Sequence, residues 1–174
     1  LTEQSLNHRG IKALILTPTR ELAAQIYDNL QEYGEFMNVC SLVIFGGVNQ
    51  NPQVRALKSG VDVLVATPGR LLDLVGQGFI KLNKIDFLVL DEADRMLDMG
   101  FLRDIQKIIK LLPHKRQNLL FSATFSKEIK KLAHEFLTDP VYVEATPENT
   151  TAEKVDQLMY RLDTQDKPKA LIHM

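Results

Sequence analysis

The stretch Phe87-Leu88-Val89-Leu90-Asp91-Glu92-Ala93-Asp94 places three carboxylates directly after four apolar residues. An unbroken apolar run of this length is typical of a strand in a parallel sheet, which is buried on both faces. Carboxylates crowded at the end of such a strand repel one another and lose hydration. A divalent cation offsets that cost, and Mg²⁺ takes one or two carboxylates together with water and phosphate oxygens. The alternative is that these acids only cap the following helix, whose dipole favours negative charge.

The same succession of an apolar run and a helical pattern repeats along the chain. Further strands are predicted over residues 13–16, 41–45, 61–66, 118–121 and 141–143. Helices are predicted over residues 21–36, 52–58, 71–75, 101–112 and 127–137. Apolar strands that alternate with helices indicate an α/β fold, a parallel sheet with helices on both faces.

Length and composition suit one globular domain. The chain has 174 residues, of which 45% are hydrophobic and 25% charged, as in ordinary globular proteins. Its formal net charge is −1, so any contact with nucleic acid has to be local. No apolar run reaches membrane-spanning length, so no membrane partner is expected. The single cysteine, Cys40, excludes a disulfide within the chain and predicts a reducing, cytoplasmic location.

Two helix starts share one sequence pattern. Thr17-Pro18-Thr19-Arg20 follows the first strand, and Thr67-Pro68-Gly69-Arg70 follows the third. In sheets of this kind ligands bind at the carboxyl ends of the strands. A helix N-terminus favours a phosphate, and an arginine adds a bidentate donor. One such start alone is better explained by helix capping, whereas two at one edge favour two phosphate contacts.

Two weaker signals lie at the same edge. Gly46-Gly47 follows the second strand, where glycine lets a backbone approach a ligand closely. Taken alone, this pair is better explained as a plain turn. Ser122-Ala123-Thr124 follows the fifth strand, and its two hydroxyls can bond the neighbouring carboxylates. A serine at a strand end is more often structural.

These motifs, in this order, resemble those of the DEAD-box family of ATP-dependent RNA helicases. Residues 18–23 resemble motif Ia, Gly46-Gly47 the double-glycine motif and residues 67–70 motif Ib. Residues 91–94 are similar to motif II, and residues 122–124 to motif III, so the resemblance covers residues 13–143. Within the family, residues 66–74 and 91–101 resemble the bacterial RhlE-type subgroup.

The resemblance implies a RecA-like first domain with defined residue roles. In that family Asp91 positions Mg²⁺ through water, and Glu92 is the general base for ATP hydrolysis. Asp94 bonds the hydroxyls of Ser122 and Thr124 and so couples the nucleotide state to RNA. Seven residues hold the sugar–phosphate backbone of one RNA strand in that family: Thr19, Arg20, Gly46, Gly47, Thr67, Gly69 and Arg70. The contact does not depend on base sequence, and it bends the strand so that a short duplex opens locally.

The chain departs from the family pattern before motif Ia. The family's glutamine-bearing adenine motif and its phosphate loop ending in Gly-Lys-Thr do not occur in the sequence. Residues 1–145 are therefore predicted to be a first helicase domain truncated at its N-terminus, residues 146–153 a linker, and residues 154–174 the start of the second RecA-like domain. ATP and Mg²⁺ are expected to serve the longer protein, and the chain alone is expected to bind neither and to be inactive.

Truncation also predicts an unpaired sheet edge at residues 118–121. Such an edge is a template for another strand. Either residues 141–143 shift inward, or a further strand predicted over residues 155–162 is exchanged with a neighbouring molecule. The expectation is a rearranged sheet or a dimer formed by strand exchange.

Three functions remain open from the residues themselves. They are an ATPase and RNA helicase, a non-catalytic RNA-binding module that keeps the fold, and a DNA translocase of a related superfamily. Glu92 favours a catalytic protein, because a module that only binds has no need of a glutamate there. The preference for RNA over DNA rests on the resemblance, because these residues contact phosphates and do not read the bases.

Overall fold

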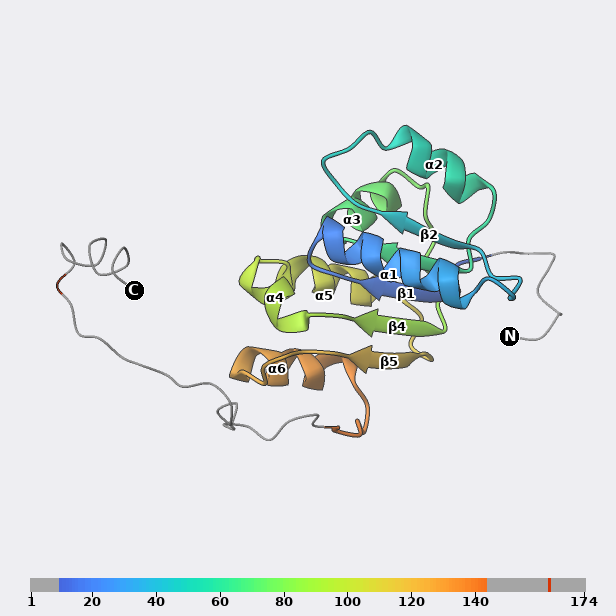
Figure 1. Ribbon diagram of the computed structural model, residues 1–174. Coiled ribbons are helices and arrows are strands. Elements are labelled where there is room, and N and C mark those ends of the chain that lie inside the picture. The colour runs from blue at the N-terminus through green and yellow to red at the C-terminus, as the bar shows by residue number, and fades with distance from the viewer. Residues whose placement is uncertain (1–9, 144–162, 164–174) are drawn as a thin grey trace. The chain divides into compact units, whose positions relative to one another are not determined.

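The computed structural model describes residues 10–143 and residue 163, and it contains a parallel five-stranded sheet. The spatial order is β2-β3-β1-β4-β5 (Figure 1). The strands are β1 (Ala13–Leu16), β2 (Ser41–Ile44), β3 (Val63–Ala66), β4 (Phe87–Leu90) and β5 (Gln117–Leu120). Every neighbouring pair is parallel, which confirms the predicted sheet.

Helices cover both faces of this sheet, as predicted. They are α1 (Arg20–Tyr33), α2 (Asn51–Lys58), α3 (Pro68–Gly76), α4 (Ala93–Asp98), α5 (Leu102–Leu111) and α6 (Lys127–Phe136). Helix α1 packs against β2 and β3 on one face, and α3 packs against α5 on the other (Figure 1). Helix α6 lies beside α5, where Gln106 Nε2 donates to Glu135 Oε2 at 2.8 Å. Helix α4 was not predicted, because six residues are too short to show a helical period.

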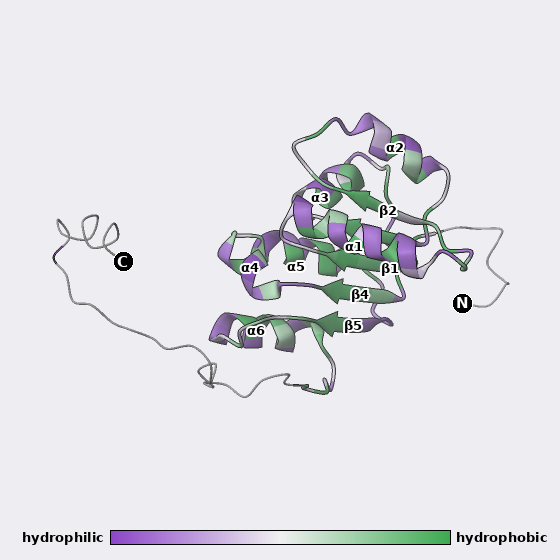
Figure 2. Cartoon of the chain, in the orientation of Figure 1, coloured by the Kyte–Doolittle hydropathy of each residue, from purple (hydrophilic) through white to green (hydrophobic). Residues whose placement is uncertain are grey.

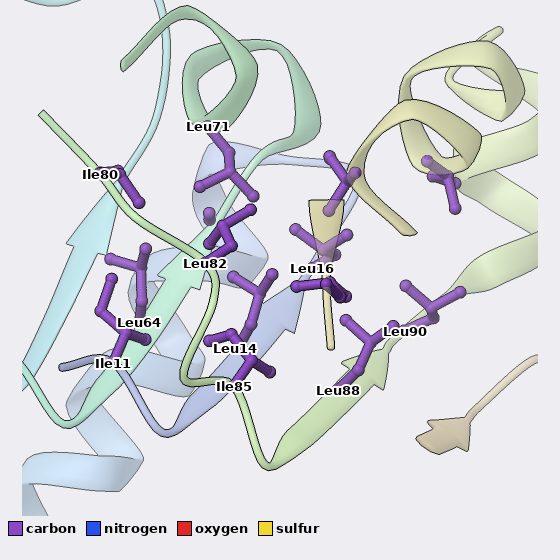
Figure 3. Close-up of a cluster of buried hydrophobic side chains, with 14 of the residues drawn as sticks. Ile11, Leu14, Leu16, Leu64, Leu71, Ile80, Leu82, Ile85, Leu88 and Leu90 are labelled. Atoms are coloured by element: carbon purple, nitrogen blue, oxygen red, sulfur yellow. The ribbon is translucent and has the colours of Figure 1, made fainter. Parts of the chain in front are cut away.

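The strand register explains why the apolar runs build one core. Leu14 of β1 lies level with Leu64 of β3 and Leu88 of β4. Because side chains alternate between faces along a strand, these leucines project from the same face. They are buried together with α3 and α5 side chains such as Leu71 and Ile105, and Figure 3 shows part of this cluster. In Figure 2 the strands are almost uniformly hydrophobic, whereas the helices carry mixed hydropathy.

One predicted strand is wrong. Residues 141–143 form neither helix nor strand, and within the described residues β5 pairs only with β4. Val141, Tyr142 and Val143 have high strand propensity, but a strand also needs a partner with which to share backbone hydrogen bonds. Without strand conformation, these residues do not form the additional strand that a rearranged sheet would need.

The chain divides into two compact units, residues 1–139 and residues 140–174. The predicted linker over 146–153 and the predicted strand over 155–162 lie outside the described residues. None of the described helices is long and apolar enough to cross a membrane.

Candidate functional site

The carboxyl ends of β1, β2 and β3 open onto a groove of about 550 Å³. Parallel strands bring these ends to one edge of the sheet, so segments far apart in the sequence meet there. Six of the residues predicted to bind a nucleic-acid backbone line the groove: Thr19, Arg20, Gly46, Thr67, Gly69 and Arg70.

The start of α1 presents both a capped helix end and an uncommitted arginine. The Thr19 hydroxyl accepts from the backbone N–H of Leu22 at 3.3 Å, so the capping interpretation holds for this side chain. Arg20, the first residue of α1, is exposed, and within the described residues its guanidinium makes no hydrogen bond or ion pair. Its charge adds to the positive end of the helix dipole, so this corner of the groove suits an anion.

The two glycines of the β2–α2 loop have different roles. Gly47 has a φ of +74°, and a Cβ added there would lie 2.8 Å from Nη1 of Arg20. A Cβ added at Gly46 would meet nothing within 4 Å. Gly46 is therefore open to the groove, whereas Gly47 makes room for the Arg20 guanidinium, and only Gly46 is among the lining residues.

The start of α3 has the same sequence pattern as α1 but a different arginine environment. Thr67 precedes the helix without a side-chain capping bond, and Pro68 is its first residue. The side chain of Arg70 is only 10% exposed. Its Nη1 donates to Gln53 Oε1 at 3.0 Å and its Nη2 to the carbonyl oxygen of Val48 at 2.9 Å. Unlike Arg20, Arg70 is therefore committed to contacts within the protein.

Two apolar residues that the sequence did not single out also line the groove. Met99 is 50% exposed, and Phe101 is half-buried against the core. They flank Gly100 in the turn between α4 and α5. The only sequence signal for this apolar wall of the groove is a Met and a Phe on either side of a glycine, just beyond the acidic motif.

The acid cluster lies at the end of β4 and has a strained backbone. Glu92 precedes α4 with φ 49° and ψ 52°, in the left-handed region that side chains other than glycine rarely adopt. Its Oε2 is buried without a hydrogen-bond donor in the described residues, and Nη1 of Arg95 lies 3.6 Å away. Asp91 Oδ1 accepts from the backbone N–H of Glu92 at 3.0 Å. Strain and an unsatisfied carboxylate oxygen are features that cluster at functional sites.

The cluster can contribute only part of a metal site. Within the described part of the chain, no three side chains of His, Cys, Asp or Glu lie close enough to hold an ion. Mg²⁺ commonly binds one or two carboxylates and completes its coordination with water and substrate phosphates. Asp91 fits that kind of site, in which water and the substrate supply the remaining ligands.

Asp94 joins the acid cluster to the segment after β5. Its Oδ2 accepts from both the backbone N–H and the hydroxyl of Thr124, each at 3.0 Å. The Ser122 hydroxyl donates to the carbonyl oxygen of Thr124 at 2.8 Å. Partial burial pushes the pKa of Asp94 upward, but the bonds from Thr124 and from the backbone N–H of Arg95, with the Ser122 hydroxyl nearby, hold that pKa below its ordinary value of 3.8. The predicted bond from Ser122 to Asp94 is replaced by the bond from Ser122 to the Thr124 carbonyl oxygen.

Helix α4 connects the acid cluster to the groove. Glu92 stands at its N-terminal cap and Met99 at its C-terminal cap. None of the predicted catalytic or coupling residues lines the groove itself. The site therefore has two parts, an acid cluster at β4 and β5 and a groove at β1, β2 and β3, linked by one short helix.

A parallel α/β sheet with an acid cluster after one strand and helix N-termini at the same edge is typical of proteins that bind phosphate groups. Residues 2–132 match the model of the DEAD/DEAH box helicase family. The chain belongs to this family.

Individual relatives agree with the family match. The chain is similar to the DEAD-box ATP-dependent RNA helicase CshA of Streptococcus pneumoniae, with 45% identity over 90% of this chain and 30% of that protein. It is similar to the ATP-dependent RNA helicase DBP3 of Lodderomyces elongisporus, with 42% identity over 96% of this chain and 32% of that protein. It is also similar to the ATP-dependent RNA helicase RhlB of Proteus mirabilis, with 41% identity over 92% of this chain and 38% of that protein. The chain thus spans about a third of the length of these relatives.

Proposed function

We propose that the chain forms most of the first RecA-like domain of an ATP-dependent RNA helicase that couples ATP hydrolysis to local opening of RNA duplexes. The observation that carries this proposal is the state of Glu92. A carboxylate held on a left-handed backbone, with one buried oxygen that accepts no hydrogen bond among the described residues and faces only Arg95 at 3.6 Å, is costly for a protein that only binds RNA. A general base that waits for water accounts for that cost.

The acid cluster provides the catalytic groups in this proposal. Bound ATP with Mg²⁺ supplies the phosphoryl group whose transfer to water drives the cycle. Asp91 would hold the ion, through water as the family resemblance implies, and the Glu92 carboxylate would take the proton from the attacking water. Hydrolysis depends mostly on positioned phosphates and compensated charge. The sequence contains no Gly-x-x-x-x-Gly-Lys loop, so the 174-residue chain alone is expected to bind neither ATP nor Mg²⁺ firmly.

The groove holds the sugar–phosphate backbone of one RNA strand. The guanidinium of Arg20, which has no polar partner among residues 10–143, and the N-termini of α1 and α3 attract phosphate oxygens. Thr19, Gly46, Thr67, Gly69 and Arg70 line the same groove, and Gly47 lies against the Arg20 guanidinium. Met99 and Phe101 give one wall an apolar surface suited to the sugar or the base face. Because these groups meet backbone rather than base edges, binding is independent of sequence.

The contact between Asp94 and Thr124 couples the two parts of the site. Together with Ser122 it fixes the segment after β5 to the first turn of α4. A change at Glu92 that shifts α4 also shifts Met99 at its other end. Nucleotide state is thereby transmitted to the RNA groove.

Several finer assignments accompany this proposal. The partners are RNA and a second RecA-like domain, and the location is the cytoplasm, supported by the single cysteine Cys40. Assignment to the bacterial RhlE-type subgroup is supported by the amino-acid sequence of residues 66–74 and 91–101. A dimer through exchange of residues 155–162 is supported by the free edge of β5 within the described residues. Light scattering of the 174-residue chain tests this last point, and a pure monomer would contradict it.

A steady-state ATPase assay of a full-length protein that contains this chain distinguishes the candidate functions. Turnover stimulated by single-stranded RNA and not by DNA is the expected result. Stimulation by DNA alone would indicate a DNA translocase. RNA binding without any turnover would indicate a non-catalytic module.

A further inference from the structure

We infer that Arg70 is a positioning residue: together with Gln53 it clamps the double-glycine loop, residues 45–48, and thereby sets the place of Arg20 in the groove. In this arrangement Arg20 meets the phosphate, and Arg70 acts through the loop. The inference rests on the proposed function in one respect, namely that the groove binds a nucleic-acid backbone.

The first support is the environment of the Arg70 guanidinium. Nη1 and Nη2 donate to Gln53 Oε1 and the Val48 carbonyl oxygen, and Nε faces Asp73 Oδ2 at 3.8 Å. All three nitrogens of the planar fork are thus directed at protein acceptors. The side chain is 10% exposed. A phosphate that bound Arg70 would have to replace these contacts and leave their acceptors unsatisfied.

The second support is that the clamp holds the loop on both sides of the glycines. Gln53 accepts from Arg70 through Oε1 and donates from Nε2 to the carbonyl oxygen of Phe45 at 3.1 Å. Arg70 itself holds the carbonyl of Val48. Gly46 and Gly47 lie between these two fixed carbonyls, so a segment with intrinsically high conformational freedom is restrained at each end.

The third support is the direct contact between this loop and Arg20. Gly47 lies so close to the Arg20 guanidinium that a Cβ would come within 3.0 Å of Cζ. The position of Gly47 therefore limits where the Arg20 side chain can lie. Arg20 has no polar contact of its own among the described residues, so the loop wall is what confines it.

Hydrogen exchange of the 174-residue chain, measured by mass spectrometry without RNA, tests the clamp itself. Arg70→Lys keeps the positive charge but lacks the planar guanidinium with its several donors. Gln53→Leu keeps a similar volume but removes the amide that bonds both Arg70 and the Phe45 carbonyl oxygen. Both variants should raise the exchange of peptides covering residues 45–54, which include the bonded N–H groups of Asn51 and Val54 at the end of the loop, by about fivefold, the effect of losing one net hydrogen bond. Arg55→Lys is the matched control, because Arg55 is an exposed residue of α2 outside the groove, and its loop exchange should equal that of the unaltered chain.

Binding of fluorescent oligouridylate by the same variants in a full-length protein tests the consequence. Arg70→Lys and Gln53→Leu should both weaken binding several-fold. Neither variant changes the net charge of the protein, so the loss would come from the position of the loop. If Arg70 met the phosphate directly, Arg70→Lys would bind nearly as the unaltered protein does, and Gln53→Leu would have no effect. That result, or unchanged loop exchange in Arg70→Lys, overturns the inference. If the unaltered protein binds no oligouridylate, the proposed function fails, whereas loop exchange still decides whether Arg70 holds the loop.

Discussion

The hydroxyl and the backbone N–H of Thr124 both donate to Oδ2 of Asp94 at 3.0 Å. This contact joins the segment after β5 to the acid cluster after β4 across 30 residues of sequence. Both groups donate to the charged form of the carboxyl, so the bond is strongest when Asp94 is ionised. The state of the acid cluster and the position of the segment after β5 therefore depend on each other.

Replacing Asp94 should make stability depend differently on pH. The folded pKa of Asp94 lies below its ordinary value of 3.8, so its contribution is present above that value and is lost as the pH falls through the folded pKa. Chemical unfolding of the chain should show Asp94→Asn less stable than the unaltered chain near neutral pH, with the difference closing below about pH 4. A difference that stays constant across this range would show that the charge of Asp94 is irrelevant to the contact.

The two glycines should respond unequally to alanine. Gly47→Ala forces a side chain into the left-handed region and against Arg20, so it should lower the free energy of unfolding by about 1–2 kcal/mol. Gly46→Ala, whose Cβ meets nothing within 4 Å, should change it by less than about 0.5 kcal/mol. Equal losses in urea titrations of the two variants would contradict the roles assigned to the loop.

Arg20→Ala should weaken RNA binding through the loss of one phosphate contact. In a full-length protein the slope of log K against log salt concentration should fall by roughly one unit, and the loss should be similar for RNAs of different sequence. Binding isotherms at several salt concentrations, with uridine-rich and adenine-rich RNAs, provide the measurement. A loss confined to one RNA would assign Arg20 to base recognition instead.

The 174-residue chain should not hydrolyse ATP measurably. Its acid cluster can activate water, but the sequence contains no Gly-x-x-x-x-Gly-Lys loop to hold the phosphates of ATP. Phosphate release with RNA present should equal that of Glu92→Gln measured in parallel. Clear turnover above that background would mean that another part of the chain holds ATP.

Much of this fold could be predicted from local pattern alone. The strands over residues 13–16 and 87–90 have the predicted bounds, because apolar runs that end at carboxylates, prolines or glycines mark both the strand and its end. The predicted strand over 141–143 failed because pairing depends on a partner, which three β-branched or aromatic residues do not disclose.

The site could be predicted less completely than the fold. The sequence placed Thr19, Gly46, Thr67 and Gly69 at one edge, since parallel strands carry their ends together. It could not distinguish Arg20 from Arg70, which have the same local pattern. What separates them is the approach of Gln53 and Val48 to one arginine and not to the other, and such long-range contacts have no local signal. Met99 was missed for the same reason.

Glu92→Gln in a full-length protein that contains this chain tests the central claim most directly. The amide keeps the shape of the side chain but cannot take a proton from water. RNA-stimulated turnover should fall by about 10²–10⁴, the usual contribution of a general base, while nucleotide binding, measured in the same preparation, stays close to that of the unaltered protein. Near-normal turnover would remove Glu92 from catalysis and would contradict the account.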